Sequence, residues 1–155
     1  MKKITGIVAV LALTAAIFSG CQSKKDVTID VDALAGDLKS SVTFVDTLDI
    51  QSNAAFENVY TMDQSDIAAK AVYVGSGATA EEIAVFEGRD EAAAGRIRKA
   101  VDTHIADNLE SYRDYQPKEV KKLSDPVIVQ TGKYVILCVS DDNTAARNCI
   151  EKYTK

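Results

Sequence analysis

The chain has 155 residues, of which 46% are hydrophobic and 26% charged, the proportions of an ordinary globular domain. Its formal net charge of -5 excludes a nucleic-acid surface built from clustered lysine and arginine. Three cysteines and one histidine leave little material for a closed zinc site, which takes four ligands. We therefore expect no metal, no cofactor and no nucleic-acid partner.

The first twenty residues have the pattern of a secretory signal. Two lysines precede an uncharged, largely apolar run over residues 4–18, and the small residues Ser19 and Gly20 come before Cys21. The run is about fifteen residues long, shorter than the roughly 20 that a permanent membrane-spanning helix needs. We expect residues 1–20 to be removed from the mature protein.

The end of this segment, Ile17-Phe18-Ser19-Gly20-Cys21, resembles the lipobox of bacterial lipoproteins. The resemblance implies that the thiol of Cys21 is diacylated and that the chain is cut just before it. Phe18 stands where most lipoboxes carry leucine. Two acyl chains, at roughly 0.8 kcal/mol per buried CH₂, anchor a protein stably where one chain binds only marginally. The alternative is an ordinary signal-peptidase site, which would release the protein.

Cleavage before Cys21 leaves 16 of the 18 basic residues against 23 acidic ones, a formal charge of -7. Residues 21–29 begin with this cysteine, are mostly polar, and are predicted to form a short tether. An anionic membrane repels an anionic domain, so we expect the domain to stand off from the lipid. The predicted location is the extracytoplasmic face of the cell membrane.

Residues 30–155 are predicted to form one domain, because no Gly/Ser-rich or Pro-rich stretch divides them. A two-lobed solute receptor needs about twice this length and is disfavoured. Asp30 is expected to cap a first helix whose apolar residues recur at helical spacing. Residues 44–60 are ambiguous, with a short helix favoured over 53–60.

Residues 69–74 and 81–87 are predicted to form a β-hairpin around a glycine-containing loop at 75–79. A short helix over 80–86 is the alternative, because alanine and glutamate are helix formers. The loop glycines are interpreted as turn residues rather than as a phosphate site, since no Lys-Ser/Thr follows them. Glu81 and Glu87, at the two ends of the second strand, are interpreted as solvated charges.

Asp90 is predicted to cap the longest helix, over residues 91–114, which at 1.5 Å per residue is roughly 36 Å long and can cross a whole sheet. The residue before a proline avoids helical geometry, so Pro117 ends this helix and can begin a short one over 118–123.

Residues 126–130 and 134–140 are predicted to form a second hairpin. The continuous apolar run of its second strand indicates a central position, covered on both faces. Asp142 or Asn143 caps a last helix. We predict an α+β fold: a single small domain with a mostly antiparallel four-stranded sheet of two hairpins covered by helices, and one long central helix.

Three segments of the domain carry a resemblance through their order and spacing. They are Glu82-Ile83-Ala84-Val85-Phe86, Tyr115-Gln116-Pro117, and Gly132-Lys133-Tyr134-Val135 running on to Val139-Ser140-Asp141. Together they resemble a family of small bacterial lipoproteins catalogued as a domain of unknown function, number 4358, over roughly residues 30–150. The resemblance implies an extracytoplasmic lipoprotein and supplies no activity, cofactor or catalytic residue. It also implies an arginine in the long helix with a glutamine four residues later, where this chain has His104 and Asn108.

Few residues offer catalytic chemistry. His104 is the one available imidazole base, and it lies in the middle of the long helix of a chain that has no Gly-x-Ser-x-Gly turn. A structural histidine is the simpler interpretation. Glu82, at the start of a predicted inner strand, is the first acid to inspect for a glycosidase-type carboxylate pair, although a solvent-facing acid is the simpler interpretation.

Cys138 and Cys149 lie on the last strand and on the helix that follows it. Outside the cytoplasm a disulfide between them is chemically permitted, whereas free cysteine packs as a small hydrophobe. Both interpretations stay open. A redox-catalytic role is not indicated, because Cys-x-x-Cys spacing is lacking.

The sequence therefore predicts a membrane-anchored extracytoplasmic lipoprotein of unknown biochemical role. A non-catalytic module that binds an envelope protein or a cell-wall component is favoured, and an unconventional cell-envelope hydrolase or a small-ligand sensor is the alternative. A polar pocket around Glu82 with a second carboxylate roughly 5 to 9.5 Å away would favour the hydrolase. A closed apolar cavity would favour the sensor, and exposed tyrosines near the sheet or the long helix would favour protein binding.

Overall fold

The structure, a computed structural model, describes residues 27–155. The predicted signal (residues 1–20) and Cys21 lie outside the described residues. The helices are α1 (Val31–Ser41), α2 (Asn53–Val59), the 3-10 turn η1 (Gln64–Asp66), α3 (Glu91–Tyr115), α4 (Val120–Ser124) and α5 (Asn143–Thr154). The strands are β1 (Asp49–Ile50), β2 (Ile67–Val74), β3 (Glu82–Gly88), β4 (Val127–Thr131) and β5 (Tyr134–Val139).

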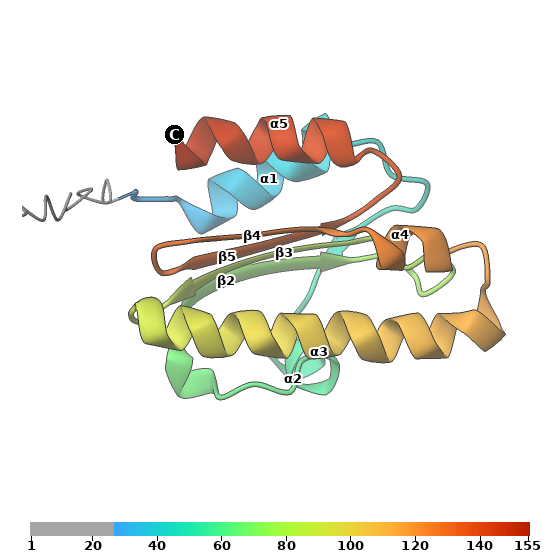
Figure 1. Ribbon diagram of the computed structural model, residues 1–155, viewed down its shortest axis with the longest axis horizontal. Coiled ribbons are helices and arrows are strands. Elements are labelled where there is room, and N and C mark those ends of the chain that lie inside the picture. Colours follow the sequence, from blue (N-terminus) through green and yellow to red (C-terminus); the bar gives the residue numbers. More distant parts are fainter. Residues whose placement is uncertain (1–26) are drawn as a thin grey trace, which may run out of the picture.

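The strands form one antiparallel sheet in the order β1-β2-β3-β5-β4. Figure 1 shows it as the middle of three layers, with α1 and α5 on one face and α2 and α3 on the other. The α+β class is therefore confirmed. Both predicted hairpins are present, β2 with β3 and β4 with β5, and the pairing of β3 with β5 joins them.

The prediction of four strands was wrong, because β1 adds a fifth at the edge beside β2. Asp49 pairs with Val74 and Ile50 with Tyr73. Both β1 residues are exposed, and a strand of two residues is too short to show the alternation by which a strand is recognised.

The middle of the sheet is buried on both faces, which explains the apolar character of its strands. Along β3, Ile83 and Val85 pack into the core shared with α1 and α5, whereas Ala84 and Phe86 pack into the core shared with α2 and α3. Every residue of β5 is buried, as its continuous apolar run predicts. The alternative of a short helix over residues 80–86 is wrong.

Helix α3 crosses the whole sheet (Figure 1) and positions the residues of the site. Its N-cap is Asp90, whose side chain accepts a hydrogen bond from the Ala93 amide at 2.7 Å. The helix ends at Tyr115, two residues before Pro117. No helix within residues 27–155 combines the length and the apolar character that crossing a membrane requires.

The two ends of the sheet differ. The described chain enters at the end where α1 begins, and the C-terminus lies near the same end (Figure 1). The opposite end carries the last turns of α3, then α4, and the β2–β3 connection. That connection is held to α3 and α4 by hydrogen bonds from Tyr112 to Thr79 and from the Ala80 amide to Glu119.

The close approach of α3 to β3 gives a test of this packing. A methyl group added at Gly88 would lie 2.7 Å from the Ala94 nitrogen and 3.0 Å from the Asp90 oxygen, both backbone atoms. We expect Gly88→Ala to lower the free energy of unfolding by about 1–3 kcal/mol, as overpacking does. Chemical denaturation by urea would measure the change.

Gly95 is the matched control, since it lies on the exposed side of α3 with nothing within 4 Å of an added methyl group. Gly95→Ala should raise stability by up to about 1 kcal/mol, because alanine is the better helix former. Equal effects of the two substitutions on the free energy of unfolding would contradict the close contact between Gly88 and the start of α3.

Candidate functional site

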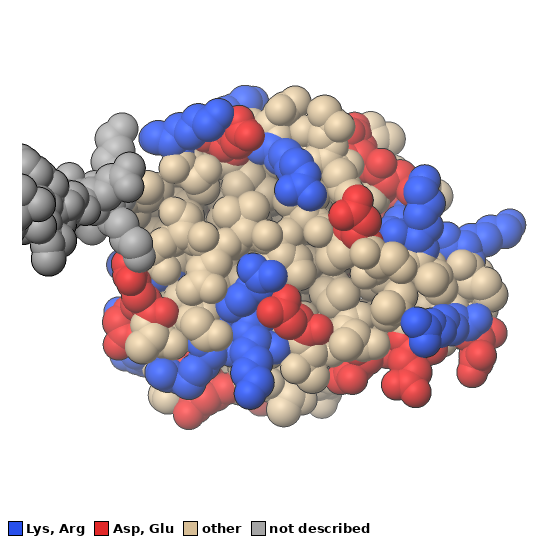
Figure 2. Space-filling view, viewed as in Figure 1, with Lys and Arg blue, Asp and Glu red and all other residues tan. Residues whose placement is uncertain are grey.

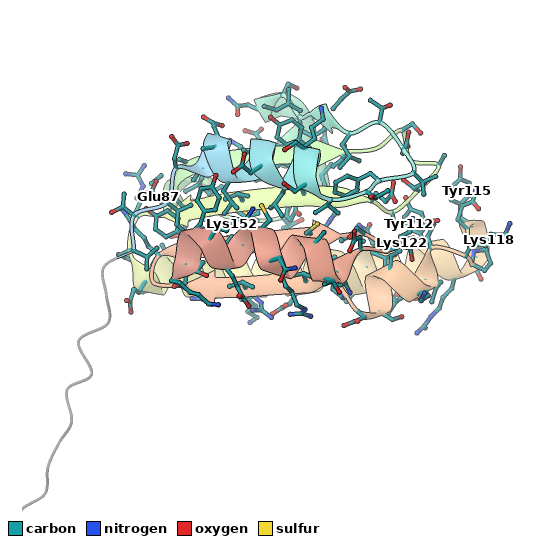
Figure 3. All side chains as sticks on the ribbon, turned by 90° about the horizontal axis from the view of Figure 1, so that it is seen from above. Glu87, Tyr112, Tyr115, Lys118, Lys122 and Lys152 are labelled. Atoms are coloured by element: carbon teal, nitrogen blue, oxygen red, sulfur yellow. The ribbon has the colours of Figure 1, made fainter. Side chains whose placement is uncertain are left out.

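A pocket of about 190 Å³ lies at the end of the sheet opposite the first described residue. One wall is the β2–β3 connection, and the other is the α3 surface around His104, Asn108 and Tyr112. Figure 3 shows Tyr112 and Tyr115 together at this end of the molecule. The pocket is therefore formed by two segments that the fold brings together from distant parts of the sequence.

Glu82 and His104 form a buried pair in the lining of this pocket. His104 Nε2 lies 2.7 Å from Glu82 Oε2, and the side chains are only 8% and 5% exposed. Tyr60, which directly follows α2, donates its hydroxyl to the other carboxylate oxygen of Glu82. Both oxygens of Glu82 are thus engaged by protein groups.

The imidazole of His104 has one further hydrogen-bond partner and one close polar neighbour. It makes a hydrogen bond with the backbone of Val59, and Asn108 Nδ2, one helical turn further along α3, lies 3.1 Å from Nε2. The ring of Tyr60 packs on the imidazole with the two centroids 4.2 Å apart. His104 is therefore fixed in position rather than free to turn toward a substrate.

The electrostatics of the pair follow from these contacts. Burial opposes a charge on His104, but the hydrogen bond and the negative charge of Glu82 outweigh it, and the pKa of His104 is raised above its ordinary value of 6.5. Burial and the charge of Glu82 hold the pKa of Tyr60 well above its ordinary value. The contact with Glu82 therefore favours the protonated form of His104, and Tyr60 donates a hydrogen bond to the same carboxylate.

A second buried ion pair lies beside the first. Lys122 Nζ on α4 is 2.9 Å from Glu81 Oε1, 3.1 Å from Glu119 Oε2 and 3.6 Å from Asp141 Oδ2. The Lys122 side chain is 4% exposed and that of Glu81 is 1% exposed. Burial opposes the charge on Lys122, but hydrogen bonds with Glu81 and Glu119 raise its pKa above the ordinary value.

Glu81 also holds the backbone that precedes β1. Its Oε2 atom accepts hydrogen bonds from the amides of Val45 and Asp46, each at 2.9 Å. The Asp46 side chain in turn accepts hydrogen bonds from Ser76, at 2.8 Å from its amide and 2.7 Å from its hydroxyl. The β2–β3 connection is thus fastened to its surroundings by charged groups.

Tyr112 holds the same connection from the α3 side. Its hydroxyl donates to the Thr79 carbonyl at 2.8 Å and approaches the Gly77 carbonyl at 3.4 Å. Gly77 has a φ of +89°, which supports its interpretation as a turn residue.

The structure brings together three residues that the sequence singles out separately: Glu82, His104 and Asn108. The expectation of a solvent-facing Glu82 is wrong, since this residue is 4% exposed. The expectation of a solvated Glu81 is also wrong, because Lys122 neutralises it inside the protein. Glu87 is partly buried and pairs with Lys133.

Sequence reasoning did not identify Tyr60 or Lys122 as parts of the site. Tyr60 gives no local signal, because its partner Glu82 lies 22 residues away. Lys122 has a weak signal in its i, i+3 spacing from Glu119, but the same spacing is common on solvated helices.

Cys138 and Cys149 lie in the core between the sheet and α5, where both are free thiols. Burial raises the pKa of Cys138 to about 12 and also raises that of Cys149. Both therefore stay protonated and pack as small apolar groups. Within residues 27–155, no group of three or more His, Cys, Asp or Glu side chains is arranged to hold a metal ion.

The fold and the site define a small α+β domain with a terminal pocket and two buried carboxylates that are paired inside the protein. Residues 40–140 match the family described as a domain of unknown function, DUF4358. The match covers well over half of the chain, including Glu82, His104 and Lys122, and the chain belongs to this family. Comparisons with curated proteins and with solved structures gave no match.

The buried pair predicts a measurable titration, because the chain has a single histidine whose NMR signals need no assignment. A folded pKa above the unfolded value means that the pair stabilises the protein fully below the unfolded pKa. That stabilisation is lost as pH rises through the folded pKa. We expect His104 to titrate above 6.5, and the free energy of unfolding to fall over the same pH range.

Glu82→Gln should lower the pKa of His104, since it removes the charge that stabilises imidazolium. It should also make the free energy of unfolding depend less on pH. Glu87→Gln, on the same strand but paired with Lys133, should leave the titration unchanged. A native imidazole that titrates below 6.5 would show that burial outweighs the Glu82 carboxylate.

Proposed function

We propose that this protein is a membrane-anchored extracytoplasmic lipoprotein whose domain is a non-catalytic binding module. The binding site is the pocket beside Glu82 and His104, and the partner is an envelope protein or a cell-wall component. The observation that carries the proposal is the position of the pocket, at the end of the domain farthest from where the chain enters.

The orientation of the domain supports this proposal. In Figure 3, Tyr112, Tyr115, Lys118 and Lys122 gather at one end, and the described chain begins at the other. Helix α3, which runs between the two ends, has 25 residues and is about 37 Å long at 1.5 Å per residue. A lipid on Cys21 would therefore direct the pocket away from the membrane, toward the wall and neighbouring proteins.

The internal pairing of charges favours binding over hydrolysis. A general base must reach the proton that it removes, but His104 Nε2 is committed to Glu82 and the side chain is 8% exposed. A glycosidase needs two carboxylates available to substrate. The second carboxylate at this end, Glu81, is bound by Lys122 and by two backbone amides.

The surface beside the pocket suits a macromolecular partner. Tyr115 is 68% exposed, and its ring lies edge-on to that of Tyr112 with centroids 6.2 Å apart. Tyrosine is enriched among the residues that carry binding energy in interfaces. Acidic and basic side chains are interspersed over the face seen in Figure 2, which supports a partner other than a long polyanion.

The anchor is tested in the native host. We expect the protein in the membrane fraction, with a diacylglyceryl group on Cys21 detected by mass spectrometry. Globomycin, which blocks the lipoprotein signal peptidase, should cause the precursor to accumulate. Processing that is unchanged by globomycin, or a mature protein recovered entirely from the medium, would defeat the anchoring part of the proposal.

The binding site is tested by photo-crosslinking in intact cells, with p-benzoylphenylalanine at position 115 or at position 152. Both native residues, Tyr115 and Lys152, are exposed, but Lys152 lies on α5, away from the pocket (Figure 3). We expect a discrete adduct from position 115 and none from position 152. Equal adducts from both positions, or none from either, would count against a binding site at the pocket.

A further inference from the structure

The hydroxyl and imidazole donors around the pocket are already committed to acceptors of the protein itself. The Tyr112 hydroxyl donates to the Thr79 carbonyl, and the Thr79 hydroxyl lies 3.4 Å from Glu81 Oε2. Tyr60 and His104 both direct protons at Glu82. The Tyr112 phenol oxygen and the backbone carbonyls keep lone pairs that can accept from a ligand. Each oxygen of Glu82 already accepts one hydrogen bond within the protein and keeps a second lone pair. The pocket is therefore rich in acceptors and suited to a ligand that donates hydrogen bonds.

The charge balance at this end points the same way. The lining of the pocket contains two carboxylates, Glu81 and Glu82, one imidazole, His104, and no lysine or arginine. Beside it, Lys122 faces three carboxylates, those of Glu81, Glu119 and Asp141. Glu81 is itself part of the pocket lining. The surplus of negative charge disfavours an anionic ligand and favours a cationic one.

The size and walls of the pocket limit what the cation is attached to. A volume of about 190 Å³ is below the range of 300–1,000 Å³ that is usual for whole small-molecule ligands, so it suits a single side-chain-sized group. Val59, Val74 and Ala80 line it with aliphatic surface, and Tyr112 adds an aromatic ring. Aliphatic walls suit a methylene stem, and an aromatic face attracts a cation.

We propose that the pocket binds a primary ammonium group on an aliphatic stem, carried either by a lysine-type side chain of a partner peptide or by a free amine. The inference rests on the proposed function and names the ligand chemistry of the same site. An ammonium group supplies three donors and one positive charge in a compact volume, which matches the acceptors and the charge surplus of the pocket.

The test is a calorimetric titration of the full-length protein, purified from membranes in detergent. The probes are Nα-acetyl-lysine N-methylamide and the same compound with a methyl group in place of the ammonium. We expect the lysine probe to bind at least about tenfold more tightly, as for one charge-assisted contact. A third probe, 1-aminopentane, distinguishes the two sources of the ammonium group. Tighter binding of the lysine probe identifies a peptide side chain, and tighter binding of 1-aminopentane identifies a free amine.

Three variants connect the affinity to the pocket. Glu82→Gln should weaken binding of the lysine probe about tenfold, whereas Glu87→Gln, at the other end of the same strand, should leave it unchanged. In case Glu82→Gln fails to fold, Asn108→Asp provides the second test, because Asn108 is only half-buried and the change adds an acceptor and a charge to the lining. We expect Asn108→Asp to strengthen binding about tenfold.

Equal binding of the charged and neutral probes, no binding of either amine, or no gain in Asn108→Asp would overturn the assignment of an ammonium ligand. These outcomes are distinct from failure of the proposed function. An adduct formed from position 115 without any amine affinity would retain the binding module and reject only its ligand chemistry.

Discussion

The pocket end of this protein depends on the buried contact between Glu81 and Lys122. This one carboxylate joins the start of β3, helix α4 and the two amides that precede β1. Removing one partner of such a buried pair typically costs about 3–5 kcal/mol, because the other charge is left unpaired. A leucine in place of Glu81 would also leave the Val45 and Asp46 amides without their acceptor. The contact therefore holds distant segments of the chain together. It also provides the hydrogen-bond acceptor that the Val45 and Asp46 amides need.

Two consecutive glutamates at the head of β3 serve different partners. Glu81 turns toward α4 and the segment before β1, whereas Glu82 turns toward Tyr60 and His104 on the side of α2 and α3, as expected where side chains alternate along a strand. Each carboxylate is paired with a basic side chain from a different helix, Glu82 with His104 and Glu81 with Lys122. Helices α3 and α4 are consequently held to the same point of the sheet, and the space between them and the β2–β3 connection stays open as the pocket.

The regular part of the fold was predictable because its signals are local. The alternation along β3, the apolar run of β5, the Asp90 cap and Pro117 each act over a few residues, and each appears in the structure where the sequence places it. The site was predictable only in pieces. Glu82 and His104 are visible as candidates, but their contact depends on how α3 returns across the sheet. Glu81 and Lys122 lie 41 residues apart. Nothing in the local sequence distinguishes a buried, paired glutamate from a solvent-exposed one.

The arrangement of the two ends has a mechanical consequence. A pull between the N-terminal end and an occupied pocket would run along the strands, so the ladder hydrogen bonds, which lie across the strands, would share the load instead of opening one at a time. Helix α1 would take the force first. Its buried side chains, Val31, Leu34, Ala35 and Leu38, are seated in a single core and would have to slide past the sheet together. A domain built this way resists shear applied between its two ends.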